Sequence, residues 1–266
     1  MDERRIKNLV KAQFGAAAQA YVTSAGHAEG DDLRRLVELA RLTGVERVLD
    51  VATGGGHTAL AFAPHVREVV ASDLTPEMLA AAETFAQSKG ASNIRFRQAE
   101  AERLPFEDAA FDVVVTRIAP HHFADPERFV AEAARVLRPG GLFLLDDNMT
   151  PEDAELDAFM NRFEQWRDPS HVRAYTQTEW IRMIEHAGLA IELVDPLYPK
   201  RYEFDAWTAR MRMPEPERRA LERWLLAAPA RCKEFFQLKV QDESVKSIAG
   251  YFGIIEGRKQ VSKEQP

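Results

Sequence analysis

Cysteine is almost absent from the sequence. Cys232 is the only one among 266 residues, so an intramolecular disulfide and a cysteine-rich metal site are both excluded. A single free thiol fits a reducing compartment, and residues 1–5 lead into no apolar stretch of the kind that signal peptides carry. We therefore expect a cytoplasmic protein.

Long hydrophobic runs and an excess of positive charge are also missing. No stretch approaches the roughly 18 apolar residues that a membrane span needs. The net charge is −7, whereas nucleic-acid-binding proteins usually present a basic surface. We expect no membrane span and no nucleic-acid partner, and the hydrophobic content of 45% is sufficient for the core of one large domain.

Short apolar runs alternate with helix-like segments in the first 150 residues. The runs are residues 48–52, 69–72, 94–96, 111–116 and 142–145. Helix starts lie between them, at Thr75-Pro76-Glu77 and at Asp125-Pro126-Glu127, where a capping residue precedes a proline. Strands that alternate with helices predict a doubly wound, mostly parallel sheet of the α/β class.

The rest of the chain is less regular. Helices are predicted at residues 31–41 and 178–187, two or three more within 205–238, and strands at 189–193 and 247–257. We expect residues 148–176 and 200–240 to be insertions around the core. The Arg138–Gly141 segment is predicted to end a helix and turn into the fifth strand.

A glycine cluster follows the first apolar run. Gly54, Gly55 and Gly56 come after Asp50 at the end of the run and before a predicted helix, and Asp73 follows the second run. Both places lie at the carboxyl edge of a doubly wound sheet, near its switch point, where a carboxylate can accept both ribose hydroxyls of an adenosine. The alternative is a plain turn, with Asp73 capping the next helix.

These glycines do not choose the ligand alone. The Gly54–Ala59 segment also fits the G-x-G-x-x-G/A fingerprint of nicotinamide dinucleotides. A carboxylate at Asp50 would be unfavourable beside a pyrophosphate. It suits S-adenosylmethionine, which carries an ammonium and a sulfonium and no phosphate.

Residues 46–147 resemble the class I S-adenosylmethionine-dependent methyltransferases, and most closely the ubiquinone/menaquinone-biosynthesis type of C-methyltransferase (methyltransferase type 11 domain). Residues 48–56 are similar to the family's first motif, although Ala52 stands where many members have glycine. Residues 73–79 resemble the ribose-binding segment, and residues 100–106 the adenine-edge segment, with Glu100 in place of the usual Asp. The resemblance implies a Rossmann-like, seven-stranded sheet with an antiparallel strand near one edge.

The resemblance also implies a cofactor site for S-adenosylmethionine, with S-adenosylhomocysteine as product. Asp73 would take the ribose hydroxyls, Leu74 would pack on the adenine, Ala101 would offer its backbone N–H to the ring, and Arg117 would lie beside the methionine part. Phe14, Tyr21 and His27 belong to an N-terminal segment resembling a cap over the cofactor, although they could equally pack a helix on the core. The full set of expected cofactor-binding residues is Asp50, Ala52, Thr53, Gly54, Gly56, Asp73, Leu74, Met78, Glu100, Ala101, Arg117, Phe14, Tyr21 and His27.

His121 and His122 follow the fourth strand and are the candidate catalytic residues. A histidine there could act as a base if the nucleophile must lose a proton, although a structural role is as good a reading. Adjacent histidines cannot easily share one ion, so no metal site is expected. The Asn/Asp-Pro-Pro-Tyr/Phe segment of many nucleic-acid and protein amino-methylating enzymes is missing at residues 117–120, which favours a small-molecule acceptor.

The sequence therefore predicts a methyltransferase enzyme, with carbon, oxygen, nitrogen and sulfur all open as the methylated atom. We expect residues 1–43 to form a helical cap, residues 44–147 the cofactor-binding core, and residues 148–266 the remainder of the sheet with helical insertions over the acceptor. The alternatives are a non-catalytic module that binds S-adenosylmethionine and a nicotinamide-dependent oxidoreductase. A homodimer is possible.

Overall fold

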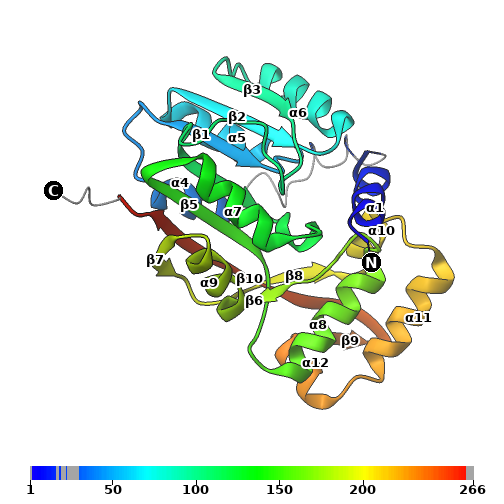
Figure 1. The fold of residues 1–266 in the computed structure, drawn as a ribbon. Helices are drawn as coiled ribbons and strands as arrows, with labels where there is room; N and C mark the ends of the chain where they lie inside the picture. Colours follow the sequence, from blue (N-terminus) through cyan, green and yellow to red (C-terminus); the bar gives the residue numbers. More distant parts are fainter. Residues whose placement is uncertain (1, 16–17, 19–21, 23–29, 262–266) are drawn as a thin grey trace.

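A single mixed sheet runs through the molecule (Figure 1). The structure, a computed structural model, describes residues 2–15, 18, 22 and 30–261. The main strand order is β3-β2-β1-β4-β5-β10-β7, with β6, β8 and β9 pairing outside this path. The strands are β1 (Arg47–Val51), β2 (Glu68–Asp73), β3 (Ile94–Gln98), β4 (Phe111–Arg117), β5 (Leu137–Thr150), β6 (Tyr175–Thr176), β7 (Leu189–Val194), β8 (Tyr198–Glu203), β9 (Lys239–Gln241) and β10 (Ser244–Lys259).

The strand order reverses between β1 and β4. The chain runs outward through β1, β2 and β3 in parallel and then crosses back to place β4 on the other side of β1, also in parallel. Strand β10 pairs antiparallel with both β5 and β7. Ligands of doubly wound sheets bind beyond the carboxyl ends of the strands at such a reversal, which places the expected site after β1, β2 and β4.

Helices cover both faces of the sheet (Figure 1). On one face, α4 and α5 pack on the strands through Leu36, Leu39 and Phe62, and on the other α7 and α9 pack through Phe129 and Trp180. The helices are α1 (Glu3–Gly15), α4 (Asp31–Leu39), α5 (His57–Phe62), α6 (Pro76–Ser88), α7 (Pro126–Val136), α8 (Ala154–Arg167), α9 (Gln177–His186), α10 (Phe204–Arg210), α11 (Glu215–Leu226) and α12 (Ala230–Phe235). Two short 3-10 turns are η1 (Ala63–His65) and η2 (Pro120–His122).

A third apolar cluster lies beyond the end of the parallel sheet, in the lower part of Figure 1. Helices α8, α10, α11 and α12 surround the first half of β10, around the buried side chains of Phe163, Trp207 and Phe236. Here β10 pairs with β8 and β9 instead of β5 and β7. One long strand therefore joins the parallel sheet to this second packing unit.

The fold prediction is confirmed, with differences in detail. Strands β6, β8 and β9 and helix α8 were not predicted. The predicted turn at Arg138–Gly141 occurs inside β5 as an irregularity, because β4 pairs Phe111 with Leu137 and then Val113 with Leu142. Gly140 has φ +76° there, a conformation that glycine adopts without strain.

Among the described residues, no helix combines the length and the apolarity that crossing a membrane would require.

Candidate functional site

The glycine loop joins the end of β1 to the start of α5 in a strained conformation. Gly54 and Gly56 have φ of +56° and +83°, and Ala52 has +58°. Glycine adopts these values freely, whereas an alanine pays about 1 kcal/mol or more. A Cβ on Gly56 would lie 3.1 Å from Cβ of Ala82 in α6. Gly56 therefore allows the start of α5 to pack closely on α6. Gly54 has no side chain to fill the space above the loop.

Asp50 lies beneath the loop. Its carboxylate is almost fully buried and accepts a hydrogen bond from Thr53 Oγ1 at 2.6 Å. Burial raises the pKa of Asp50 to about 7, because a charged carboxylate loses its hydration in the protein interior. This residue supports the loop from below.

Asp73 ties the loop to the next strand. It is the last residue of β2, and its Oδ2 accepts from the backbone N–H of Gly54 at 3.0 Å while Oδ1 accepts from that of Thr75 at 2.9 Å. The Thr75 side chain makes no capping hydrogen bond to α6. Asp73 therefore also holds the start of this helix, through its bond to the Thr75 N–H. Each carboxylate oxygen can accept a second bond, so Asp73 can still bind a ligand hydroxyl.

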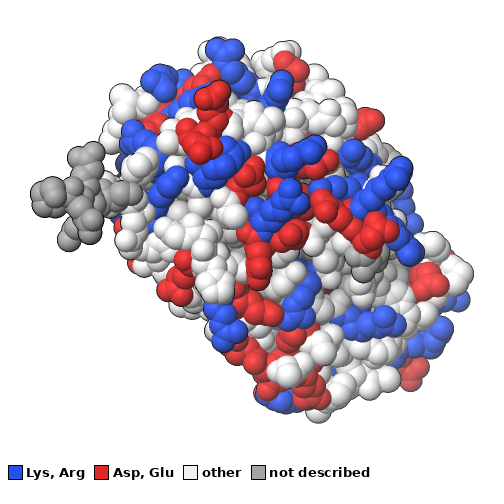
Figure 2. Space-filling model, viewed as in Figure 1, with Lys and Arg blue, Asp and Glu red and all other residues white. Residues whose placement is uncertain are grey.

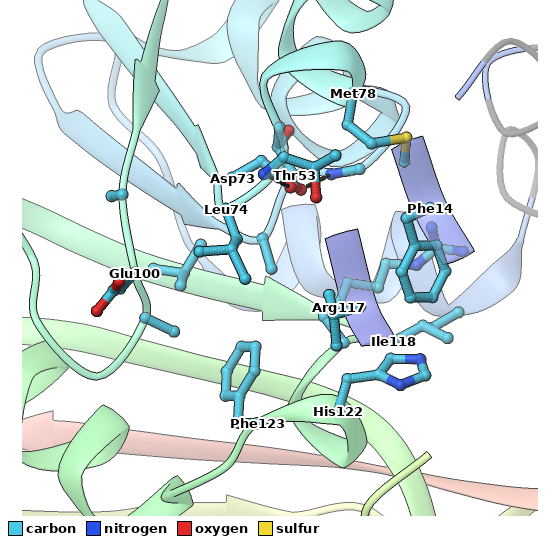
Figure 3. A pocket seen from close by; sticks show the side chains of 18 of the residues that line it. Phe14, Thr53, Asp73, Leu74, Met78, Glu100, Arg117, Ile118, His122 and Phe123 are labelled. Atoms are coloured by element: carbon cyan, nitrogen blue, oxygen red, sulfur yellow. Dashed lines mark hydrogen bonds between the residues drawn. The ribbon is translucent and has the colours of Figure 1, made fainter. Parts of the chain in front are cut away.

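A cavity opens over this loop (Figure 3), and we call it the loop cavity. It has about 1000 Å³ of space that protein atoms do not fill, part of it open to solvent. Figure 3 shows Asp73 and Thr53 on one side of the space, opposite His122 and Phe123. Its lining is Lys7, Val10, Phe14, Val51, Ala52, Thr53, Gly54, Gly55, His57, Thr58, Asp73, Leu74, Thr75, Met78, Ala99, Glu100, Ala101, Glu102, Arg117, Ile118, Ala119, His122 and Phe123.

Helix α1 forms one wall of the loop cavity. Lys7 lies 3.1 Å from a Glu100 oxygen and 3.4 Å from a Glu102 oxygen, and so fastens α1 to the segment after β3. Glu102 is buried and accepts from the backbone N–H of Ala124 at 3.0 Å. No motif in the sequence marks Lys7, because its partner lies more than 90 residues away.

Arg117 ends β4 inside a buried ion-pair network. Its Nε is 2.6 Å from an oxygen of Asp32 in α4 and 3.7 Å from one of Asp146 in β5. The same Asp32 oxygen is 2.9 Å from Nζ of Lys200 in β8. Arg117 therefore lines the loop cavity with its charge already balanced by carboxylates from other elements.

A second cavity adjoins the first, and we call it the histidine cavity. It has about 1310 Å³ of space that protein atoms do not fill, again partly open to solvent. The two cavities share Phe14, Ile118 and His122, so they meet at these side chains. The lining of the histidine cavity is Phe14, Gly30, Asp31, Asp32, Ile118, His121, His122, Asn148, Arg167, Asp168, Tyr198, Pro199, Lys200, Arg201, Tyr202, Trp207, Arg210, Met211 and Phe252.

The pKa values of the two adjacent histidines shift in opposite directions. Burial opposes the charged form of His121, but the Asp147 carboxylate, 2.6 Å from its Nδ1, outweighs burial and raises the pKa. Burial and the neighbouring His121 lower the pKa of His122. Nδ1 of His122 lies 3.0 Å from the carbonyl oxygen of Ser170. A carbonyl can only accept, so Nδ1 carries the hydrogen and Nε2 has a free lone pair.

Most of the expected site residues come together. Eleven of the sixteen line the loop cavity: Phe14, Ala52, Thr53, Gly54, Asp73, Leu74, Met78, Glu100, Ala101, Arg117 and His122. His121 lines the histidine cavity, while Asp50 and Gly56 line neither and support the loop. Tyr21 and His27 lie outside the described residues.

Comparison with known proteins gives a consistent result. The profile of a family described as a methyltransferase domain matches residues 49–145. The methyltransferase YcgJ of Bacillus subtilis (strain 168), itself uncharacterised, is 43% identical over 197 residues, which are 74% of this chain and 78% of that protein. A demethylmenaquinone methyltransferase of Thermus thermophilus is 42% identical over 131 residues, 47% of this chain and 59% of that protein.

The similarity extends to three dimensions. The crystal structure of YcgJ from Bacillus subtilis matches with a TM-score of 0.84 at 37% identity, covering 87% of this chain and 99% of that one. The predicted resemblance is thereby confirmed, and the nicotinamide-dependent oxidoreductase alternative has no support. The chain belongs to the S-adenosylmethionine-dependent methyltransferases.

Proposed function

We propose that this enzyme methylates a small molecule bound in the histidine cavity, with S-adenosylmethionine in the loop cavity. The observation that carries the proposal is the junction of the two cavities at Phe14, Ile118 and His122. A methyl donor and its acceptor must come within about 3–3.5 Å of each other in line. Two adjoining cavities with shared walls supply this arrangement.

The residues of the loop cavity fit the cofactor. Asp73 has acceptor capacity left for the ribose hydroxyls, and Gly54 presents no side chain to the space. In this proposal Leu74 and Met78 pack on the adenine, and Ala101 offers its backbone N–H to the ring edge. When bound, S-adenosylmethionine supplies an electrophilic methyl group on a sulfonium.

The chain's own contribution is orientation and exclusion of water. Helix α1 closes the loop cavity through Phe14, whose ring meets the His122 ring edge-on with 4.9 Å between centroids. His122 presents its Nε2 lone pair as a hydrogen-bond acceptor at the junction. Enclosure raises the effective concentration of the acceptor and excludes water as a competing nucleophile.

The distribution of surface charge also favours a small-molecule acceptor over a nucleic acid. Acidic and basic side chains are mixed over the face shown in Figure 2, with no continuous basic area. Such mixed charge does not favour binding of a polyanion. A module that binds the cofactor without transferring its methyl group would need no second cavity. The histidine cavity therefore favours a catalytic function over such a module.

Calorimetric titration tests the cofactor part of the proposal. We expect S-adenosylmethionine and S-adenosylhomocysteine to bind with micromolar affinity and NAD not to bind. Asp73→Ala should weaken binding at least tenfold, because it removes a charged acceptor of hydrogen bonds. Glu77→Ala, an exposed acid of α6, is the matched control and should leave the affinity unchanged. Binding of NAD alone would overturn the proposal.

A further inference from the structure

The inner end of the histidine cavity presents hydrogen-bond acceptors without partners. Asp168 and Asn148 line it with 0% and 3% of their surface exposed. Within the described part of the chain, Oδ2 of Asp168 and Oδ1 of Asn148 accept no hydrogen bond. A buried acceptor without a donor costs about 1–3 kcal/mol, so a ligand that brings hydrogen-bond donors would be favoured here.

Asp168 holds His122 in its orientation. Its Oδ1 accepts from the backbone N–H of Ser170 at 2.9 Å and from the Ser170 hydroxyl, and the Ser170 carbonyl accepts from Nδ1 of His122. Oδ2 of Asp168 then lies 3.9 Å from Nε2 of His122. Two acceptors at this separation can each accept from one hydrogen of the same –NH₂ group.

The charge at this end of the cavity is negative. Asp147 is paired with His121, and Glu164 lies 3.2 Å from Arg167, whose guanidinium also faces the Trp207 ring at 4.9 Å. Asp168 is a third carboxylate beside these two pairs, and the positive charge of Arg167 also acts on it. Arg201 and Arg210 lie at the exposed mouth, where water and salt screen their charge.

We infer that the methyl acceptor is a primary amine on an aromatic or apolar body, whose nitrogen donates one hydrogen bond to Asp168 Oδ2 and one to His122 Nε2. This inference rests on the proposed function. Tyr202 and Trp207, stacked at 8° with 5.5 Å between centroids, both line the cavity and make part of its wall apolar. An alcohol or phenol reacts best as an oxyanion, which the adjacent Asp168 carboxylate would repel.

The reaction balances with one proton released. The entering ammonium loses a proton to solvent, and the neutral nitrogen keeps two N–H groups for Asp168 and His122 while its lone pair remains free. The nitrogen–carbon bond forms as the carbon–sulfur bond breaks, and the bonding pair stays on sulfur. Positive charge moves from sulfur to nitrogen, next to Asp168, where a carboxylate stabilises it.

The test uses three ligands of similar shape on the protein saturated with S-adenosylhomocysteine. Calorimetry compares 2-phenylethylamine, 2-phenylethanol and 3-phenylpropionate. We expect the amine to bind about tenfold more tightly than either other ligand, since a charge-assisted hydrogen bond is replaced by a neutral bond or a repulsion. Asp168→Asn keeps the Oδ1 acceptor and should abolish the preference, whereas Asp205→Asn, an exposed acid outside the cavity, should retain it.

Each outcome decides the inference. The inference would be overturned if the alcohol or the carboxylate bound as tightly as the amine or more tightly, or if the amine showed no measurable binding. The three ligands are compared on the unmodified protein, so this result does not depend on whether the variant folds. The affinity for S-adenosylhomocysteine is measured first. If that ligand does not bind, the proposed function fails; if it binds and the amine preference is missing, only the inference fails.

Discussion

Two non-glycine residues at the edge of the loop cavity hold left-handed backbone conformations. Ala52 has φ +58° and Ile118 has φ +54°, and each follows a central strand of the sheet. For a β-branched residue such as Ile118 this conformation is a marked outlier. Strain of this kind persists where the surrounding structure fixes it, and it concentrates at ligand sites. Its presence after both β1 and β4 is consistent with a site at the switch point.

Replacing Ala52 by glycine should stabilise the protein. The left-handed conformation costs alanine about 1–2 kcal/mol, partly offset by the greater flexibility of glycine in the unfolded chain. We expect Ala52→Gly to raise the free energy of unfolding by about 0.5–1 kcal/mol in a denaturant titration. Ala80→Gly, at an exposed position inside α6, should instead lower it by about 1 kcal/mol. A loss of stability in both variants would contradict the strain at Ala52.

Asp50 should make the ligand-free protein sensitive to pH. Its pKa is about 7 in the folded state and 3.8 as the reference value, so the folded state binds more protons between these values. Stability from this group is full below pH 3.8 and is lost as the pH rises to 7. Asp50→Asn removes the penalty, and its stabilisation should be about 2.5 kcal/mol larger at pH 8 than at pH 5. Urea titrations at both pH values measure it, and a gain that does not depend on pH would refute the assignment.

At the scale of elements, the sequence predicts what is periodic and misses what is short or polar. The five parallel strands contain apolar runs that alternate with helix-like segments, so their pattern is readable. Strand β8 alternates half-buried and exposed residues and contains Pro199, and β9 is three exposed residues long. Neither segment has the apolar pattern that marks a strand in the sequence. Both are strands because they pair with β10.

Helix α1 should respond to cofactor binding. It contacts the rest of the cavity through Lys7, Val10 and Phe14 but contributes only Ile6 to the buried core, so its stability depends on the cavity that it covers. We expect S-adenosylhomocysteine to slow amide hydrogen exchange in residues 2–15 at least fivefold by local ordering. Exchange in α11, which lines neither cavity, is the internal control and should not change. Unchanged exchange in α1 on ligand binding would exclude its role as a wall of the site.

In the molecule as a whole, the residues of the loop cavity are easier to predict from the sequence than those of the histidine cavity. Asp73 and Gly54 lie in contiguous motifs at strand ends, so their convergence follows from the topology. Asp32, Asp168 and Lys200 come from separate elements, and no spacing in the sequence brings them together. The sequence predicts helical insertions over the acceptor, and it predicts His122 because this residue follows a strand end. The convergence of these three charged residues could be seen only in the structure. Dimerisation and the proposed division at residues 43 and 147 stay predictions.

The buried network around Asp32 should hold these elements together. Asp32 joins α4 to Arg117 in β4 and to Lys200 in β8. Removing one partner of a buried pair leaves a charge without compensation, which costs about 3–5 kcal/mol. We expect Asp32→Ala to lower the free energy of unfolding by about 3 kcal/mol. Asp31→Ala, whose side chain is exposed, should change it by less than about 0.5 kcal/mol. Equal effects of the two substitutions would argue against the network.

A crystal structure of the complex with S-adenosylhomocysteine would show directly whether the cofactor lies in the loop cavity. We expect the ribose hydroxyls on the Asp73 carboxylate and the sulfur atom facing the junction formed by Phe14, Ile118 and His122, with the histidine cavity open beyond it. A ligand bound elsewhere, or one whose sulfur faces away from that junction, would contradict it.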